Sequence, residues 1–284
     1  MTKRKMNLFL PRLQKELDVW TKPLLMGIIN LTPDSFYPGS RFRDNDLLLR
    51  RIDEMVNTGA DIIDLGGEST RPGSESISLD EELQRLIPAV EIIRKNFDIP
   101  ISVDTYKSEV AKQSLESGAD IINDISGLNF DTEMASIVSE AGAPIIIMHM
   151  QGRPKSMQQD PYYEDVIEEI CKFFVERIDF AESRGIVREQ IILDPGIGFG
   201  KRLHDNLMII TFFDKLHVFN LPLLIGASRK SLIQDVLNLP VDERLEGTLA
   251  IHAIAIDRGV NILRVHDVAE NRRFVDMLQA IGKA

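Results

Sequence analysis

Cysteine is nearly absent from this sequence of 284 residues, and long apolar runs are absent altogether. The single cysteine, Cys171, excludes an intrachain disulfide framework and fits a reducing compartment, so we expect a cytoplasmic protein. No stretch approaches the ~18 consecutive apolar residues that a transmembrane helix needs. The apolar run at residues 6–11 is too short for a secretory signal. We therefore expect no membrane partner.

Basic residues are also in the minority. The chain has 33 Lys+Arg against 44 Asp+Glu, which gives a net charge of −11 and a pI near 5.0. This excess of negative charge argues against a protein that binds nucleic acid through its phosphates. With 44% hydrophobic and 27% charged residues, the composition is that of a globular protein and not of a disordered chain.

Several catalytic motifs are missing as well. The sequence has no H-E-x-x-H, no H-x-H after its first apolar run and no cluster of Cys and His, which argues against a transition-metal hydrolase. The segment Gly-Ile-Gly-Phe-Gly-Lys at 196–201 lacks the Ser/Thr and the spacing of a phosphate-binding P-loop. No G-x-S-x-G elbow is present, so a covalent acyl-enzyme is not expected.

The sequence does contain a repeated alternation of short apolar runs and helical segments. Eight runs rich in β-branched residues, as expected of buried parallel strands, cover residues 24–30, 60–67, 99–105, 119–125, 143–150, 190–196, 221–228 and 261–267. Apolar residues at helical spacing lie between them, in segments that include 46–58, 78–96, 131–141, 162–184 and 243–258. Eight strand–helix repeats predict a closed (β/α)8 TIM barrel. We expect residues 1–22 to form an N-terminal extension and residues 23–284 a single domain.

An open, doubly wound α/β sheet is the alternative fold. It is disfavoured because no G-x-G-x-x-G follows the first apolar run; residues 27–30 lead into a polar loop instead.

Polar side chains gather at the carboxyl end of each predicted strand, whereas the opposite ends are plain turns. In a TIM barrel the carboxyl ends meet at one face and carry the active site. Asp104, Asn123 and Asp194 can accept hydrogen bonds from the N–H groups of a flat nitrogen heterocycle, and Lys230 can donate to a ring carbonyl opposite them. A second, donor-rich group suits a phosphate or diphosphate ester, and its members are Asn30, Thr70, Arg71, Arg264 and His266.

Eight short motifs follow one another at these strand ends. They are MGIINLTPDSF (26–36), GGESTRPG (66–73), SVDTYK (102–107), NDISG (123–127), MHMQGRP (148–154), DPGIGFGK (194–201), GASRKS (226–231) and RVHDV (264–268). With these motifs in this order, the chain resembles the dihydropteroate synthase family from about residue 24 to residue 268. One departure is Tyr-Pro-Gly-Ser at 37–40, where the family pattern has Ser-Asp-Gly-Gly.

The resemblance implies a reaction and its partners. In this family, 6-hydroxymethyl-7,8-dihydropterin diphosphate and 4-aminobenzoate give 7,8-dihydropteroate and diphosphate, a step of folate biosynthesis that sulfonamides target. The implied cofactor is Mg2+, bridging diphosphate oxygens near Asn30. A homodimer through outer helices is also implied.

The resemblance further implies a role for each matching residue. The catalytic residues would be Asp104, Lys230 and Arg71. The pterin would contact Asp104, Asn123, Met148, Asp194 and Lys230; the diphosphate would contact Asn30, Thr70, Arg71, Arg264, Val265 and His266; and 4-aminobenzoate would contact Phe36, Pro72, Phe199 and Ser231. By the same resemblance, diphosphate departs first and leaves a pterin-methyl cation, which Asp104 stabilises and the arylamine captures.

Two other functions compete with this one. A methyltransferase that takes its methyl group from a folate would share the Asp/Asn pterin edge, and an inactive homologue would only bind pterin. The first is disfavoured because residues 68–73 and 228–231 keep the motifs that serve diphosphate and aminobenzoate. The second needs a lost site residue, and none is missing. Other polar residues are predicted to be structural, namely Asp61, Asp120, Asp124, His149 and His252.

Overall fold

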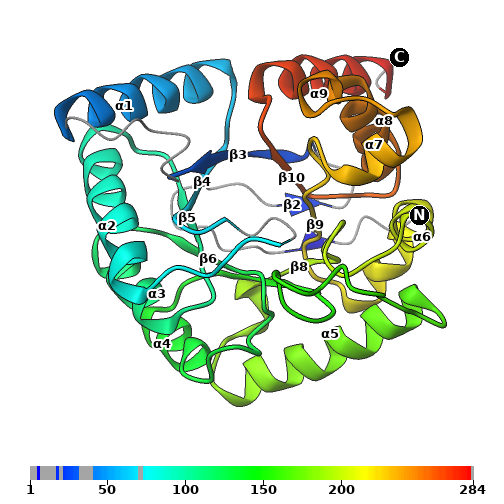
Figure 1. Ribbon diagram of the computed structural model, residues 1–284, viewed down its shortest axis with the longest axis horizontal. Helices are drawn as coiled ribbons and strands as arrows, with labels where there is room; N and C mark the ends of the chain where they lie inside the picture. Colours follow the sequence, from blue (N-terminus) through cyan, green and yellow to red (C-terminus); the bar gives the residue numbers. More distant parts are fainter. Residues whose placement is uncertain (1–4, 7–16, 19–21, 32–40, 70–72, 283–284) are drawn as a thin grey trace.

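The parallel strands close into a barrel, as the sequence predicts (Figure 1). The computed structural model describes residues 5–6, 17–18, 22–31, 41–69 and 73–282. The barrel strands are β3 (Leu24–Asn30), β4 (Ile62–Gly66), β5 (Ile101–Asp104), β6 (Ile121–Asp124), β7 (Ile145–Met148), β8 (Ile191–Asp194), β9 (Leu224–Ile225) and β10 (Ile262–Val265). They pair in the order β8-β7-β6-β5-β4-β3-β10-β9, and a parallel bridge between Leu193 and Leu223 closes the ring. The open-sheet alternative is therefore wrong.

Helices surround the barrel, with α1, α2, α3, α4 and α5 following one another along its outside (Figure 1). The helices are α1 (Arg41–Thr58), α2 (Leu79–Asn96), α3 (Ser108–Glu116), α4 (Met134–Ala141), α5 (Val166–Ser183), α6 (Leu203–Thr211), α7 (Ser231–Leu237), α8 (Leu245–Asp257) and α9 (Val268–Gly282). Short 3-10 segments occupy Arg188–Gln190, Phe213–Phe219 and Val241–Glu243. Ser78 caps α2, since its hydroxyl accepts the amide of Glu81 at 3.2 Å.

The amino-terminal part of the barrel interior is filled by a cluster of large apolar side chains. This apolar floor consists of Leu24, Met26, Ile62, Ile121, Ile146, Ile192, Leu224 and Ile262, all 2% exposed or less. Alternate residues of the same strands, such as Leu25, Ile63 and Leu263, pack outward against the helices. The twofold alternation of a strand thus divides the core into a barrel interior and an outer shell.

Polar side chains that are buried or half-buried fasten neighbouring strands at their amino ends. Asp61 accepts the amide of Leu25 at 2.9 Å, and Asp120 accepts the amide of Ile101 at 2.9 Å. Asn261 repeats this arrangement with the amide of Leu223 at 2.8 Å. The structural roles predicted for Asp61 and Asp120 are confirmed.

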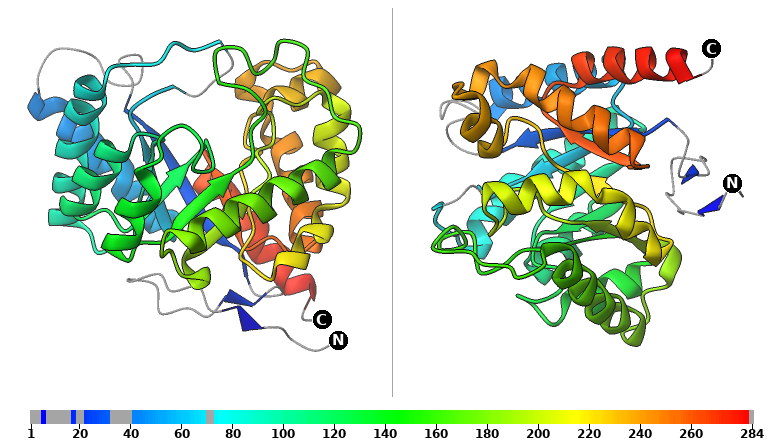
Figure 2. Two further views of the ribbon diagram at one scale, coloured as in Figure 1. Left: turned by 90° about the horizontal axis from the view of Figure 1, so that it is seen from below. Right: turned by 90° about the vertical axis from the view of Figure 1, so that its right-hand side faces the viewer.

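The short strands β1 (Lys5–Met6) and β2 (Leu17–Asp18) pair antiparallel outside the barrel. Figure 2 shows them at the amino ends of the barrel strands, the end of the barrel toward which α9 also runs. Lys22 forms an ion pair with Asp276 of α9 and so ties the start of β3 to that helix. None of the helices within the described ranges is both long and apolar enough to cross a membrane.

Removing the Asp120 carboxylate should destabilise the barrel. Asp120→Ala removes a carboxylate that pairs with Arg94 and accepts the Ile101 amide, so we expect the free energy of unfolding to fall by about 3 kcal/mol. Urea denaturation would measure the loss. Glu116→Ala, on the exposed surface of α3, is the control and should change stability by less than about 0.5 kcal/mol. Equal stabilities of the two variants would contradict the role of Asp120.

Candidate functional site

A polar layer lies directly above the apolar floor, at the carboxyl ends of the strands. Asp64, Asn123, Asp194 and Arg264 each follow a floor residue of their own strand by two positions, so their side chains turn into the barrel. Met148 stands in the same relation to Ile146. Parallel pairing aligns these strand ends, which is why residues 200 positions apart in the sequence come into contact.

The Arg264 guanidinium is the centre of the polar layer. Its Nε donates to Asp64 Oδ2 at 2.6 Å, and its Nη2 donates to Asp104 Oδ2 at 2.8 Å. The Asn123 side-chain amide also reaches Asp64 Oδ2, at 3.5 Å. The second oxygens of both carboxylates, Asp64 Oδ1 and Asp104 Oδ1, are buried and have no hydrogen-bond partner among the described residues. Two buried acceptors that lack donors are suited to the N–H groups of a ligand.

The carboxylates of Asp64 and Asp104 share one cation, Arg264, and this arrangement affects the pKa of Asp104. Burial raises the pKa of Asp104 from 3.8 to about 7; Arg264 opposes the shift, and the neighbouring carboxylate of Asp64 adds to it. Asp104 therefore changes its protonation state near neutral pH.

Asp194 supplies a third carboxylate on the far side of the barrel from β4. It is 4% exposed, and its Oδ1 accepts the Gly196 amide at 2.7 Å. Burial raises its pKa, whereas that hydrogen bond and the charge of Lys230 lower it. Asp104, Asn123 and Asp194 thus converge on one space, as predicted.

Lys230 faces these carboxylates from the loop after β9. Burial and the charge of Arg264 lower its pKa to about 8, while Asp194 and Asp104 favour its charged form. Its Nζ lies 3.9 Å from the centroid of the Phe199 ring, a cation–π contact. Phe199 packs with Ile125, Met148 and Met157, so an apolar wall stands beside the polar layer.

The backbone conformation that directs Lys230 inward depends on Arg229. Arg229 has a φ of 57°, the left-handed region that side chains other than glycine rarely adopt. A two-pronged ion pair with Asp267, at 2.8 and 2.6 Å, holds it there and joins the ends of β9 and β10. Lys230 and Ser231, the first residue of α7, follow directly.

The residues expected to hold diphosphate are only partly described. Asn30 and His266 lie at the ends of β3 and β10, both half-buried. His266 accepts from or donates to the Ser228 hydroxyl at 3.1 Å, and burial together with Arg264 lowers its pKa to about 4, so it is neutral at pH 7. Val265 packs into the outer shell, which leaves only its backbone for a ligand. Phe36, Thr70, Arg71 and Pro72 lie outside the described residues.

Two features of the site were missed in the sequence. Asp64 lies inside an apolar run and not at its end, so a search for polar strand ends passes over it. The signal available was its spacing, two positions after Ile62 and therefore on the same strand face. The Arg229–Asp267 ion pair carried no such signal, because it joins separate strands.

Asp124 and His149 turn away from the polar layer. Asp124 accepts the amides of Ser126 and Leu128, both at 2.8 Å, and so shapes the loop after β6. The His149 ring packs on Phe173 with centroids 4.9 Å apart. The structural roles predicted for both residues agree with these contacts.

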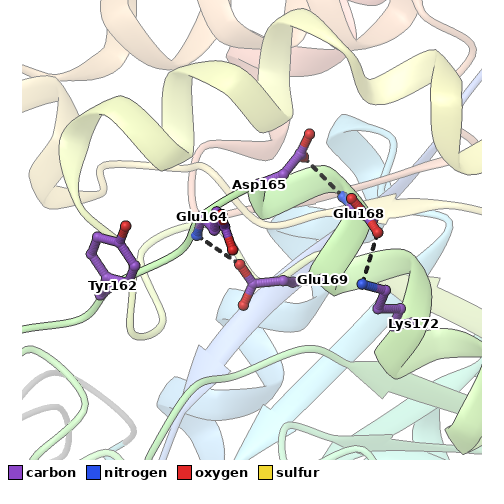
Figure 3. Close-up of a pocket in the computed structure, with 6 residues that line it drawn as sticks. All are labelled: Tyr162, Glu164, Asp165, Glu168, Glu169 and Lys172. Atoms are coloured by element: carbon purple, nitrogen blue, oxygen red, sulfur yellow. Dashed lines mark hydrogen bonds and ion pairs between the residues drawn. The ribbon is translucent and has the colours of Figure 1, made fainter.

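A depression on the surface at the start of α5 is separate from this site (Figure 3). It is lined by Tyr162, Glu164, Asp165, Glu168, Glu169 and Lys172. Asp165 caps the helix by accepting the Glu168 amide at 3.0 Å, and Glu168 pairs with Lys172 at 2.7 Å. The acidic groups of this depression thus stabilise the N-terminal end of α5.

Asp104 should make stability depend on pH. Between about pH 4 and pH 7 the folded state keeps a proton that the unfolded state has released, so the wild type loses stability as pH rises through this range. Asp104→Asn removes this dependence. The free energy of unfolding of the variant, relative to that of the wild type, should therefore rise by on the order of 2–4 kcal/mol from pH 4 to pH 8. Denaturation of both proteins at each pH would measure it. Asp53→Asn, on the exposed face of α1, is the control, and its stability should depend on pH as that of the wild type does. The same pH dependence in Asp104→Asn would contradict the raised pKa of Asp104.

Comparison with known proteins agrees with this geometry. Residues 26–266 match the family described as pterin binding enzyme. The chain is 47% identical to a dihydropteroate synthase of Escherichia coli over 258 residues, 91% of each chain. It also superposes on a dihydropteroate synthase of Yersinia pestis in complex with a sulfonamide drug, with a TM-score of 0.89, 40% identity and coverage of 100% of this chain and 99% of the other.

A dihydropteroate synthase of Xanthomonas albilineans with bound 4-aminobenzoic acid is similar over the full length of both chains, with a TM-score of 0.89 and 35% identity. Sequence and structure thus agree across the whole barrel. The chain belongs to the dihydropteroate synthase family of pterin-binding enzymes.

Proposed function

We propose that this protein condenses 6-hydroxymethyl-7,8-dihydropterin diphosphate with 4-aminobenzoate to give 7,8-dihydropteroate and diphosphate. The observation that carries the proposal is the pair of unpartnered oxygens, Asp64 Oδ1 and Asp104 Oδ1, above an apolar floor; Arg264 holds both carboxylates through their other oxygens, Oδ2. The relatives are dihydropteroate synthases, which favours this reaction over methyl transfer and over pterin binding without catalysis.

The polar layer suits the edge of a pterin ring. An aminopyrimidinone edge presents parallel N–H donors that a carboxylate accepts as a fork, and Asp194 is the carboxylate we assign to that edge. We assign Asn123 and Asp104 to the nitrogens opposite that edge, and Lys230 to the ring carbonyl as its donor. Met148, 3% exposed, provides an apolar surface against the ring.

In the proposed reaction, the bond between the pterin methylene carbon and the diphosphate oxygen breaks first, and its electron pair leaves with diphosphate. The resulting cation is delocalised over the pterin ring. The ionised Asp104 stabilises this cation, because opposite charges attract strongly in a buried site. The arylamine nitrogen then forms the new C–N bond and releases a proton.

Arg264 has two roles in this scheme. Its bonds to Asp64 and Asp104 fix the carboxylates, and its positive charge attracts the departing diphosphate. His266 donates only as a neutral imidazole at pH 7, since its pKa is about 4. We assign Asn30, Thr70, Arg71 and the Val265 backbone to the same diphosphate.

Mg2+ is the proposed cofactor, and Asn30 fits it. Mg2+ prefers oxygen ligands and commonly takes one or two from the protein and the rest from phosphate and water. A Cβ on Gly66 would lie 3.6 Å from Asn30 Oδ1, so the glycine keeps the space beside that oxygen open. No metal-binding group of three His, Cys, Asp or Glu occurs in the described ranges, so the ion would depend on diphosphate oxygens. When bound, Mg2+ neutralises charge on the leaving group.

We assign the 4-aminobenzoate slot to Phe199, Ser231, Phe36 and Pro72. Phe199 offers an aromatic face beside Lys230, and Ser231 opens α7 at the rim. The Xanthomonas relative holds 4-aminobenzoic acid and the Yersinia relative a sulfonamide drug. We propose that this slot accepts both.

A cytoplasmic homodimer completes the proposal. Val236 and Leu237 of α7 and Ile254 of α8 are 57%, 46% and 45% exposed, although all three are apolar. A second copy of the chain would cover such a surface.

Turnover should show the function directly. With Mg2+ and both substrates, the purified protein should form 7,8-dihydropteroate and diphosphate in equal amounts. Asp194→Ala, which removes the acceptor for the pterin edge, should fold and lower kcat/KM by at least about 100-fold. Diphosphate without dihydropteroate, or no product while pterin still binds, would contradict the proposed reaction.

Lys230 should contribute more to binding of the pterin diphosphate than to binding of 4-aminobenzoate. Lys230→Ala should weaken binding of the pterin diphosphate by roughly 10–100-fold, because a buried charged donor is lost. Titration with each substrate would measure this. Lys112→Ala, on the exposed face of α3, is the control and should bind normally. Unchanged pterin affinity in Lys230→Ala would refute its role.

A further inference from the structure

A buried lysine without a carboxylate partner lies next to the proposed site. Lys201 ends the glycine-rich segment after β8 and is 3% exposed. Among the described residues, no carboxylate lies within ion-pair distance of its Nζ. Burial lowers its pKa to about 7, and Asp194 favours the charged form. A buried lysine of this kind needs other groups to replace its lost water.

Those groups are backbone carbonyls of two adjoining loops. Lys201 Nζ donates to the carbonyls of Gly196 at 2.9 Å, Phe199 at 3.0 Å and His149 at 3.2 Å. It also lies 3.0 Å from His149 Nδ1, so with the histidine proton on Nε2 the three N–H groups of the ammonium are shared among four acceptors. Burial and Lys201 keep the pKa of His149 well below its usual value, in agreement with a neutral ring. The ammonium thus joins the loops after β7 and β8.

The segment after β8 depends on such contacts because it lacks regular secondary structure. Its other carbonyls also bond to side chains: that of Gly198 accepts Gln158 at 2.7 Å, and that of Gly200 accepts the Tyr163 hydroxyl at 2.9 Å. The backbone packs closely as well, since a Cβ on Gly196 would lie 2.0 Å from the His149 carbonyl oxygen. Lys201 is the one of these donors that binds two carbonyls within the segment.

This segment carries the apolar wall of the site. The carbonyl that Lys201 holds at 3.0 Å belongs to Phe199, whose ring lies against the Lys230 ammonium. Gly198 also abuts the Lys230 side chain, since a Cβ added to this glycine would lie 3.3 Å from Lys230 Cδ. Asp194, by contrast, lies on β8, where pairing with β7 fixes it. Asp194 does accept the Gly196 amide, but its backbone stays paired in the sheet, so loosening the segment would move Phe199 more than Asp194.

We propose that Lys201 is a positioning residue for 4-aminobenzoate: it holds the Phe199 backbone so that the ring forms the wall of the aminobenzoate slot. The inference rests on the proposed function. Lys201 touches neither substrate and acts through Phe199.

The test compares the two KM values in Lys201→Met and Lys201→Gln. Methionine fills the space but binds no carbonyl, whereas glutamine keeps two N–H donors without the charge. We expect Lys201→Met to raise the KM for 4-aminobenzoate about tenfold or more and to change the KM for the pterin diphosphate less than about threefold. Lys201→Gln should lie between Lys201→Met and the wild type. If Lys201→Met does not fold, the two KM values of Lys201→Gln alone test the proposal.

The wild type and Lys112→Met are assayed alongside, and the latter should match the wild type. An unchanged KM for 4-aminobenzoate in a folded Lys201 variant, or an equal rise in both KM values, would overturn the role of Lys201 while leaving the proposed function intact. Absence of dihydropteroate with the wild type would contradict the proposed function and the inference with it.

Discussion

The bond of one guanidinium to two buried carboxylates is the interaction on which the site depends. Arg264 connects β10 to β4 and β5 through Asp64 and Asp104, so one positive charge is shared by two buried carboxylates inside the barrel. Each carboxylate keeps an oxygen that Arg264 does not use. The same interaction therefore stabilises the charges in the protein and leaves acceptors for a ligand.

The fold makes this arrangement possible in a simple way. An apolar layer seals the barrel below the polar residues, and the Asp61, Asp120 and Asn261 side chains fasten the strands at the amino ends. Strand geometry then carries every second residue above that layer into the interior. Loops after β8 and β9 add Phe199 and Lys230 to the wall, through the contacts of Lys201 and of the Arg229–Asp267 pair.

Local patterns in the sequence predict much of this structure. The apolar runs correspond to the eight strands, and Asp104, Asn123 and Asp194 converge as polar ends of parallel strands should. Contacts between distant residues are not predictable in this way: Asp64 and Arg264 are 200 positions apart, and neither residue type specifies the other. Lys201 is harder still, because its partners are backbone carbonyls, which every residue has.

A crystal structure of this protein with bound pterin tests the central claim most directly. The account predicts a ring above the apolar floor, with its N–H groups within about 3 Å of Asp194 and of the free oxygen of Asp104 or Asp64, and with Arg264 still bonded to both carboxylates. A pterin bound elsewhere, or a ring in the barrel that leaves those oxygens without donors, would contradict it.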